Sequence, residues 1–70
     1  MSESIYKVIT LVGTSTESWE KAVANAVEQA SKTLRDLRVA EVLQFDTTIE
    51  NGKIAAYRVK VNLSFKFEGS

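Results

Sequence analysis

The feature that most constrains this chain is the spacing of its apolar residues, which changes period twice within 70 residues. A β-branched segment at residues 5–12 precedes a stretch with apolar residues at every third or fourth position, and two alternating segments follow. These periods are typical of a strand, a helix and two more strands, in that order. One helix can cover only one face of a three-stranded sheet, so the pattern predicts a structure too thin to enclose a core by itself.

The first strand is expected over residues 5–12, ending at Gly13, and its β-branched composition favours burial of both faces. Polar residues suited to start a helix come next. Ser15 is the preferred N-cap, because its hydroxyl can accept a hydrogen bond from an amide of the first turn. A capping box of Thr14 with Glu17 is the alternative.

A single apolar stripe then extends over about five turns, roughly 30 Å of helix. Its members are Trp19, Ala22, Val23, Ala26, Val27, Ala30, Leu34 and Leu37. The helix is expected to end between Asp36 and Arg38, because Val39 begins an alternating pattern. Trp19 is interpreted as a packing anchor rather than a ligand-stacking residue.

The second strand has two sets of alternating residues. Val39, Leu43, Phe45, Thr47 and Ile49 are assigned to one face with Glu41 as the odd member, and Ala40, Val42, Gln44 and Asp46 to the other. In the third strand Tyr57, Val59, Val61, Leu63, Phe65 and Phe67 alternate with Arg58, Lys60, Asn62, Ser64 and Lys66. Asn51-Gly52 between the two strands predicts a hairpin turn, since both residues tolerate a positive φ.

Two registers are possible for this hairpin. A two-residue turn would pair Phe45 with Arg58, and Leu43 with Lys60, which mixes apolar and polar faces. A three-residue loop over Glu50, Asn51 and Gly52, with a bulge at Gly52, pairs Phe45 with Tyr57 and Leu43 with Val59. The second register keeps apolar residues together and is therefore the one expected.

The chain length allows a single domain, residues 1–70. Chains this short bury only about 60% of the surface exposed on unfolding, and they need disulfides, a metal or association to be stable. The absence of cysteine and histidine excludes disulfides and the common transition-metal sites. Association with further copies of the chain is the remaining source of stability.

Several classes of function are disfavoured by the composition. Nine basic residues balance nine acidic ones without a basic run, which argues against nucleic-acid binding. Neither a membrane span nor a secretory signal is visible, so a cytoplasmic location is expected. No carboxylate pair or nucleophile with its base indicates catalysis, so we expect a protein that is not an enzyme.

The order and spacing of several short segments resembles the dodecin family over essentially the whole chain. These segments are Tyr6-Lys7-Val8-Ile9, Val12-Gly13-Thr14-Ser15, Ser18-Trp19-Glu20, Lys32-Thr33-Leu34-Arg35, Glu41-Val42, Ile49-Glu50-Asn51-Gly52-Lys53 and Tyr57. The resemblance implies an α+β protomer of β-α-β-β topology, with a three-stranded antiparallel sheet on one long helix. It also implies a hollow spherical homododecamer without catalytic activity, which binds riboflavin, lumichrome or FMN in pairs and serves in flavin storage.

In that family a tryptophan at the start of the second strand stacks on the flavin, and a glutamine after the tyrosine of the third strand bonds its polar edge. Val39 and Arg58 stand at these positions here. Val39, Gln44 and Arg58 are therefore the residues that the resemblance places near a flavin ring. Valine cannot stack, whereas Arg58 retains hydrogen-bond donors. The chain is more similar to the branch described as calcium-associated, so a flavin site, a calcium site and a purely structural assembly remain alternatives.

Calcium requires six to eight oxygen ligands. Oxygen-bearing residues gather near the hairpin, namely Asp46, Thr47, Thr48, Glu50 and Asn51, but without the spacing of an EF-hand, and a solvated hairpin tip is the simpler interpretation. The ligands of any metal are left unassigned, since a site shared between copies would not be visible in the sequence. Glu41 is expected to pair with Arg38 or with an arginine of another copy.

Overall fold

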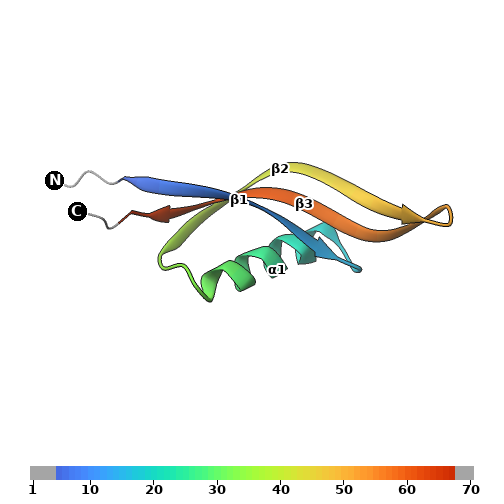
Figure 1. Ribbon diagram of the computed structural model, residues 1–70, viewed down its shortest axis with the longest axis horizontal. Coiled ribbons are helices and arrows are strands. Elements are labelled where there is room, and N and C mark those ends of the chain that lie inside the picture. Colours follow the sequence, from blue (N-terminus) through green and yellow to red (C-terminus); the bar gives the residue numbers. More distant parts are fainter. Residues whose placement is uncertain (1–4, 68–70) are drawn as a thin grey trace.

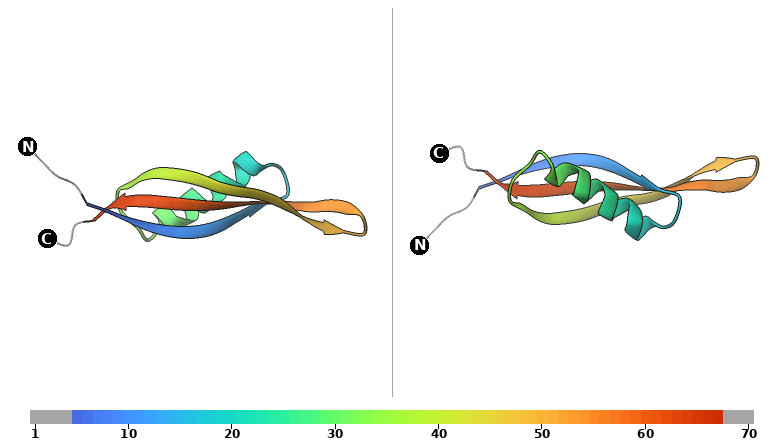
Figure 2. Two further views of the ribbon diagram at one scale, coloured as in Figure 1. Left: turned by 90° about the horizontal axis from the view of Figure 1, so that it is seen from above. Right: turned by 90° about the horizontal axis from the view of Figure 1, so that it is seen from below.

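The computed structural model describes residues 5–67. Strand β1 (Tyr6–Ser15) is followed by helix α1 (Trp19–Ser31), strand β2 (Leu37–Glu50) and strand β3 (Lys53–Lys66). The three strands form one sheet in the order β1-β3-β2, with β3 antiparallel to both neighbours. The helix lies on one face of this sheet and runs obliquely across it (Figures 1 and 2). The predicted β-α-β-β topology is confirmed.

The hairpin between β2 and β3 closes through a two-residue turn. Asn51 and Gly52 have φ angles of 53° and 76°, and Glu50 pairs with Lys53. The predicted three-residue loop with a bulge at Gly52 is therefore wrong. The positive φ predicted for Asn51-Gly52 is confirmed, and it matches the twist of the two strands.

Bulges replace the predicted register. Thr48 pairs with Ala56 and Ile49 with Ile54, so Ala55 is the extra residue on β3. Phe45 consequently lies opposite Val59 rather than opposite Tyr57 or Arg58. The predicted partner of Phe45, Tyr57, is therefore wrong, but Phe45 does pair with an apolar residue. The inserted Ala55 shifts the pairing by one residue and so brings apolar side chains of both strands to the same face.

A second bulge reverses the alternation of side chains along β2, so that odd-numbered residues lie on one face of the sheet before the bulge and on the other face after it. Val42 pairs with Val61 and Gln44 with Lys60, which leaves Leu43 as the extra residue. We call the face that carries Val59, Val61 and Leu63 the helix face, and the opposite face the outer face. Because of this bulge, Val39 and Glu41 lie on the outer face, whereas Phe45 lies on the helix face. The predicted grouping of Val39 with Phe45 is wrong for this reason.

Helix α1 is shorter than predicted. Ser18 is its N-cap, and its side chain accepts a hydrogen bond from the amide of Lys21, so the expected cap at Ser15 and the Thr14–Glu17 capping box are both wrong. Ser15 Oγ instead accepts hydrogen bonds from the amides of residues 17 and 18, at 2.9 and 3.4 Å, which tightens the turn before the helix. In the described region, no helix has the length and apolar character that crossing a membrane requires.

The helix ends at Ser31, not near Asp36. The amides of Thr33 and Leu34 both donate to the carbonyl of Ala30, and Asp36 adopts a φ of 58° that turns the chain into β2. Leu34 continued the apolar spacing because it packs against the core from the connecting segment. The apolar spacing therefore predicted which residues are buried, but the predicted length of the helix was too great by more than one turn.

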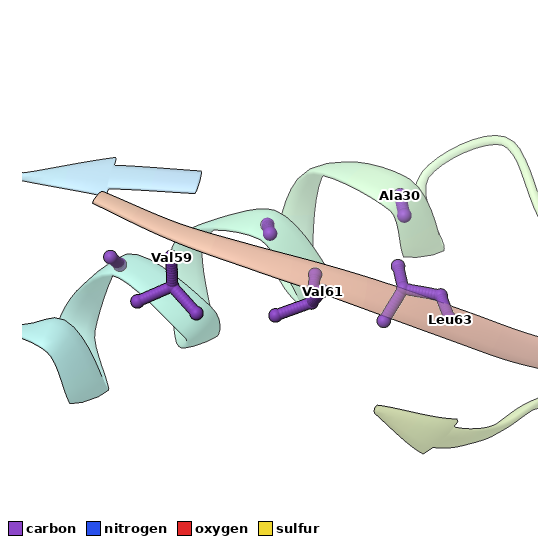
Figure 3. Close-up of a cluster of buried hydrophobic side chains, with 6 residues drawn as sticks. Ala30, Val59, Val61 and Leu63 are labelled. Atoms are coloured by element: carbon purple, nitrogen blue, oxygen red, sulfur yellow. The ribbon is translucent and has the colours of Figure 1, made fainter. Parts of the chain in front are cut away.

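The core is small and consists of one helix stripe on one strand (Figure 3). Its fully or nearly fully buried members are Ala22, Ala26, Ala30, Val59, Val61 and Leu63. Alanines on α1 allow the helix to approach the sheet closely. At Gly13 the helix leaves no room for a side chain, since a Cβ added there would lie 2.2 Å from the carbonyl oxygen of Ala22.

Much apolar surface lies outside this core. Large apolar side chains at least 39% exposed occur on β1, at the start of α1, along β2 and in the hairpin. They include Tyr6, Val8, Val12, Trp19, Val39, Val42, Leu43, Phe45, Ile49 and Ile54. In a single copy, the predicted burial of β1 on both faces is thus met on the helix face only, because no second layer covers the outer face.

The protomer is also elongated. Its Cα radius of gyration is 14.5 Å, whereas a compact chain of this length has about 11 Å. The pairing of β1 ends at Ser15 opposite Tyr57, so the hairpin tip, residues 48–56, projects as a two-stranded ribbon beyond β1 and α1 (Figure 2). Such a ribbon is only marginally stable in water without further packing.

Candidate functional site

The three residues predicted near a ligand all lie on the outer face of the sheet. Gln44 pairs with Lys60, and Arg58 is the neighbour of Lys60 on the same face of β3. Val39 pairs with Ser64, four residues along from Lys60, which corresponds to about 13 Å. The fold thus brings Gln44 and Arg58 together, and it places Val39 on the same face but farther along the strands.

Arg58 forms the best-defined polar contact of this face. It pairs across the sheet with Asp46, and its Nε and Nη2 donate to Oδ1 and Oδ2 of that carboxylate at 2.7 and 2.8 Å. Both side chains remain partly exposed, at 43% for Arg58 and 39% for Asp46. This bidentate geometry fixes the plane of the guanidinium and uses two of its five N–H donors.

The protonation of both partners follows from this contact. The hydrogen bond from Arg58 lowers the pKa of the Asp46 carboxyl below its ordinary value of 3.8; partial burial opposes this shift, and the charge of the guanidinium adds to it. The same hydrogen bond raises the pKa of Arg58, with a further contribution from the charge of Asp46. Both groups are therefore charged at neutral pH, and as a pair they carry no net charge.

Asp46 is also tied to the helix on the other side of the sheet. The indole Nε1 of Trp19 donates to the backbone carbonyl of Asp46 at 3.1 Å. The indole meets Phe45 and Tyr57 edge-on, with ring centroids 5.7 and 5.0 Å away. The expectation that Trp19 is a packing anchor agrees with these contacts, which connect the first turn of α1 to β2 and β3.

Sequence reasoning did not identify Asp46 as the partner of Arg58. From the sequence, Asp46 is assigned to one face of the second strand and to the oxygen-bearing residues near the hairpin, and the expected register sets Asp46 opposite Ala56 rather than Arg58. The spacing from the Asn51-Gly52 turn held only part of the information, since a two-residue turn alone sets Asp46 opposite Tyr57, and the bulge at Ala55 shifts its partner to Arg58.

A metal site within one protomer has no support in residues 5–67. No three Asp or Glu side chains gather there closely enough to hold a metal ion. Arg38 lies 4.0 Å from Asp36 rather than beside Glu41, so the predicted Arg38–Glu41 pair is wrong. Glu41 pairs in register with Asn62 on the outer face, and its pairing with another copy stays a prediction.

Two hollows lie among residues 5–67 of the protomer, and neither Gln44 nor Arg58 lines either of them. The larger, of about 700 Å³, is an open groove between α1 and β1 whose lining includes Leu11, Ala26 and Leu34. The smaller, of about 170 Å³, lies under the start of β2 and is lined by Val27, Val39 and Leu63, among others. A ligand held by Gln44 and Arg58 would therefore lie on an open sheet face and require a second copy to enclose it.

Comparison with known proteins gives consistent results. The family model described as Dodecin matches residues 5–68. The structure of dodecin from Streptomyces coelicolor superposes with a TM-score of 0.94 at 44% identity, covering 100% of both chains. Dodecin from Thermus thermophilus is 39% identical over 64 residues, 91% of this chain and 93% of that protein.

A further relative is named for a metal. Calcium dodecin from Mycobacterium tuberculosis is 44% identical over 63 residues, 90% of this chain and 89% of that protein. Its crystal structure, described as having a novel calcium-binding site, superposes with a TM-score of 0.83 and covers 96% of both chains. Sequence and fold agree along nearly the whole length of this chain, which therefore belongs to the dodecin family.

Proposed function

We propose that this protein is a non-enzymatic storage or buffering protein, which assembles into a hollow homododecamer and holds a small ligand between copies. The observation that carries the proposal is the apolar surface that one copy leaves in water, on the outer face of β1 and along β2 and the hairpin. Covering such surface with further copies stabilises a chain whose core has only six buried apolar residues among residues 5–67.

Flavin, the family ligand, would bind weakly. Val39 offers no aromatic face, and offset stacking on such a face is worth roughly 1 kcal/mol beyond burial of area. Arg58 stands where the family has a glutamine, and two of its donors are already used by Asp46. Val39, Gln44 and Arg58 thus form a flavin site that has lost its stacking residue and gained an ion pair.

Calcium is the second candidate ligand, and the similarity to calcium dodecin favours it. Since the described part of one protomer offers no cluster of carboxylates, the ion would be held by oxygens from more than one copy. A site of this kind follows from the same assembly, because six to eight oxygens can meet at a symmetry axis.

Light scattering on the purified protein tests the assembly. A homododecamer has a mass of about 94 kDa, twelve times the 7.8 kDa of one chain. We expect this mass to persist on dilution to micromolar concentration. A compact, thermally stable species of 7.8 kDa would contradict the proposal.

Two titrations on the assembled protein distinguish the ligands. Quenching of riboflavin emission at micromolar protein would assign a working flavin site despite Val39. A melting temperature that rises with calcium, but not with magnesium or riboflavin, would assign calcium. No response to any of the three would leave a purely structural shell and contradict the storage function.

A further inference from the structure

The Arg58–Asp46 pair has a consequence for the kind of ligand that the outer face accepts. On that face Arg58 is flanked by Thr14 of β1 and Asp46 of β2, and Lys60 follows it along β3. The carboxylate takes two guanidinium donors at 2.7 and 2.8 Å. Three N–H donors remain, on a group whose charge is already neutralised.

A neutralised guanidinium and a free one select different ligands. A free guanidinium binds phosphate strongly, through paired charge-assisted hydrogen bonds. A guanidinium bound to a carboxylate can still donate to a neutral carbonyl, but an approaching phosphate meets the negative charge of Asp46 within the same contact. Displacing Asp46 would leave that carboxylate without its two hydrogen bonds.

We propose that Asp46 is a specificity-determining residue, which holds Arg58 as a neutral donor and so selects carbonyl-bearing neutral ligands over phosphate-bearing ones. The proposal rests on the proposed function, in that it takes the outer face to be the ligand face. In this proposal Asp46 does not contact the ligand; it is a positioning residue that orients Arg58 and neutralises its charge.

Riboflavin and FMN are suitable probes, because they differ only in a phosphate group. We expect the assembled protein to bind riboflavin more tightly than FMN. Asp46→Asn keeps the size of the side chain and removes its charge, so the positive charge of Arg58 is no longer neutralised. A charge-assisted bond to phosphate should then tighten FMN binding by roughly tenfold or more. Riboflavin affinity should change by much less.

Two matched variants accompany this test. Asp46→Glu retains the carboxylate and should preserve the preference of the unsubstituted protein for riboflavin. Glu28→Gln removes one negative charge from the exposed surface of α1, away from the sheet, and controls for net charge. Equal gains in FMN affinity for Asp46→Asn and Glu28→Gln would overturn the proposal, since net charge alone would then explain the effect.

A further variant keeps the proposal testable if Asp46→Asn fails to assemble. Arg58→Gln leaves Asp46 with an unneutralised charge, so FMN binding should weaken relative to riboflavin. Unchanged or improved FMN binding by Arg58→Gln would overturn the proposal. So would the absence of measurable binding of either flavin to every variant. The mass of each protein is measured first, because a monomeric unsubstituted chain would contradict the proposed assembly rather than the role of Asp46.

Discussion

At the scale of single residues, the ion pair on the outer face makes stability depend on pH in a defined direction. The folded pKa of Asp46 is lower than its ordinary value of 3.8, so its contribution to stability is complete above that pH. It is lost as the pH falls through the lowered folded pKa, because protonation removes one partner of the pair.

Asp46→Asn provides the corresponding measurement. The gap in melting temperature between this variant and the unsubstituted protein should be full at neutral pH and should close as the pH falls below 3.8. Thermal scans at equal protein concentration follow it. A gap that widens on acidification would contradict the role assigned to the carboxylate.

Trp19 supports a second prediction at this scale. Trp19→Phe retains an aromatic ring beside Phe45 and Tyr57 but removes the indole N–H that donates to Asp46. The loss of one such hydrogen bond should cost about 1 kcal/mol of stability. Denaturation in urea measures the difference, and equal midpoints for the two proteins would show that the bond contributes nothing.

Among the secondary-structure elements, strand β2 shows which features the sequence could predict and which it could not. The alternation of apolar residues predicted a long strand, and Asn51-Gly52 predicted its turn; both are confirmed. The bulge at Leu43 could not be found in this way, because an inserted apolar residue within an apolar strand leaves no break in composition. It nevertheless moves Val39 to the outer face, on which Gln44 and Arg58 also lie.

The contact between β1 and α1 depends on Gly13. A Cβ at this position would lie 2.2 Å from the carbonyl oxygen of Ala22 and 3.0 Å from Cβ of Ala26. Gly13→Ala must therefore move the helix away from the sheet, and such overpacking typically costs about 1–3 kcal/mol. We expect a lower melting temperature at the same protein concentration.

A double variant identifies which contact is responsible. Ala26→Gly removes the side-chain contact but leaves the carbonyl of Ala22 in place, and a glycine within a helix has its own cost of roughly 1 kcal/mol. Gly13→Ala with Ala26→Gly should therefore be no more stable than Gly13→Ala alone. Recovery of stability in the double variant would show that the backbone can yield and that the side chains set the limit.

At the scale of the whole molecule, the uncovered apolar residues lie on both faces of one sheet. Val8 and Val12 share the outer face of β1 with the polar row of β3, whereas Phe45 and Val42 lie on the helix face of β2. A single two-fold contact on one face would leave the other face in water. Covering both faces would take two different contacts per copy, which the proposed closed shell would supply.

Two substitutions, one on the outer face of β1 and one in the projecting hairpin, test this requirement. Val8 is 51% exposed on the outer face, and Ile49 is 67% exposed on the projecting hairpin, so neither belongs to the core of the protomer. Val61, by contrast, is fully buried beneath α1, and a charge there would disrupt the fold itself. Val8→Asp and Ile49→Asp should each reduce the assembled mass or yield aggregate, because each places an unpaired charge in a buried contact between copies.

Thr16→Asp, at an exposed polar position before the helix, should leave the mass unchanged. Full-sized, stable assemblies from both Val8→Asp and Ile49→Asp would mean that these surfaces face water in the shell. If only one variant assembles to full size, the surface substituted in that variant is not a contact between copies, and the other surface is.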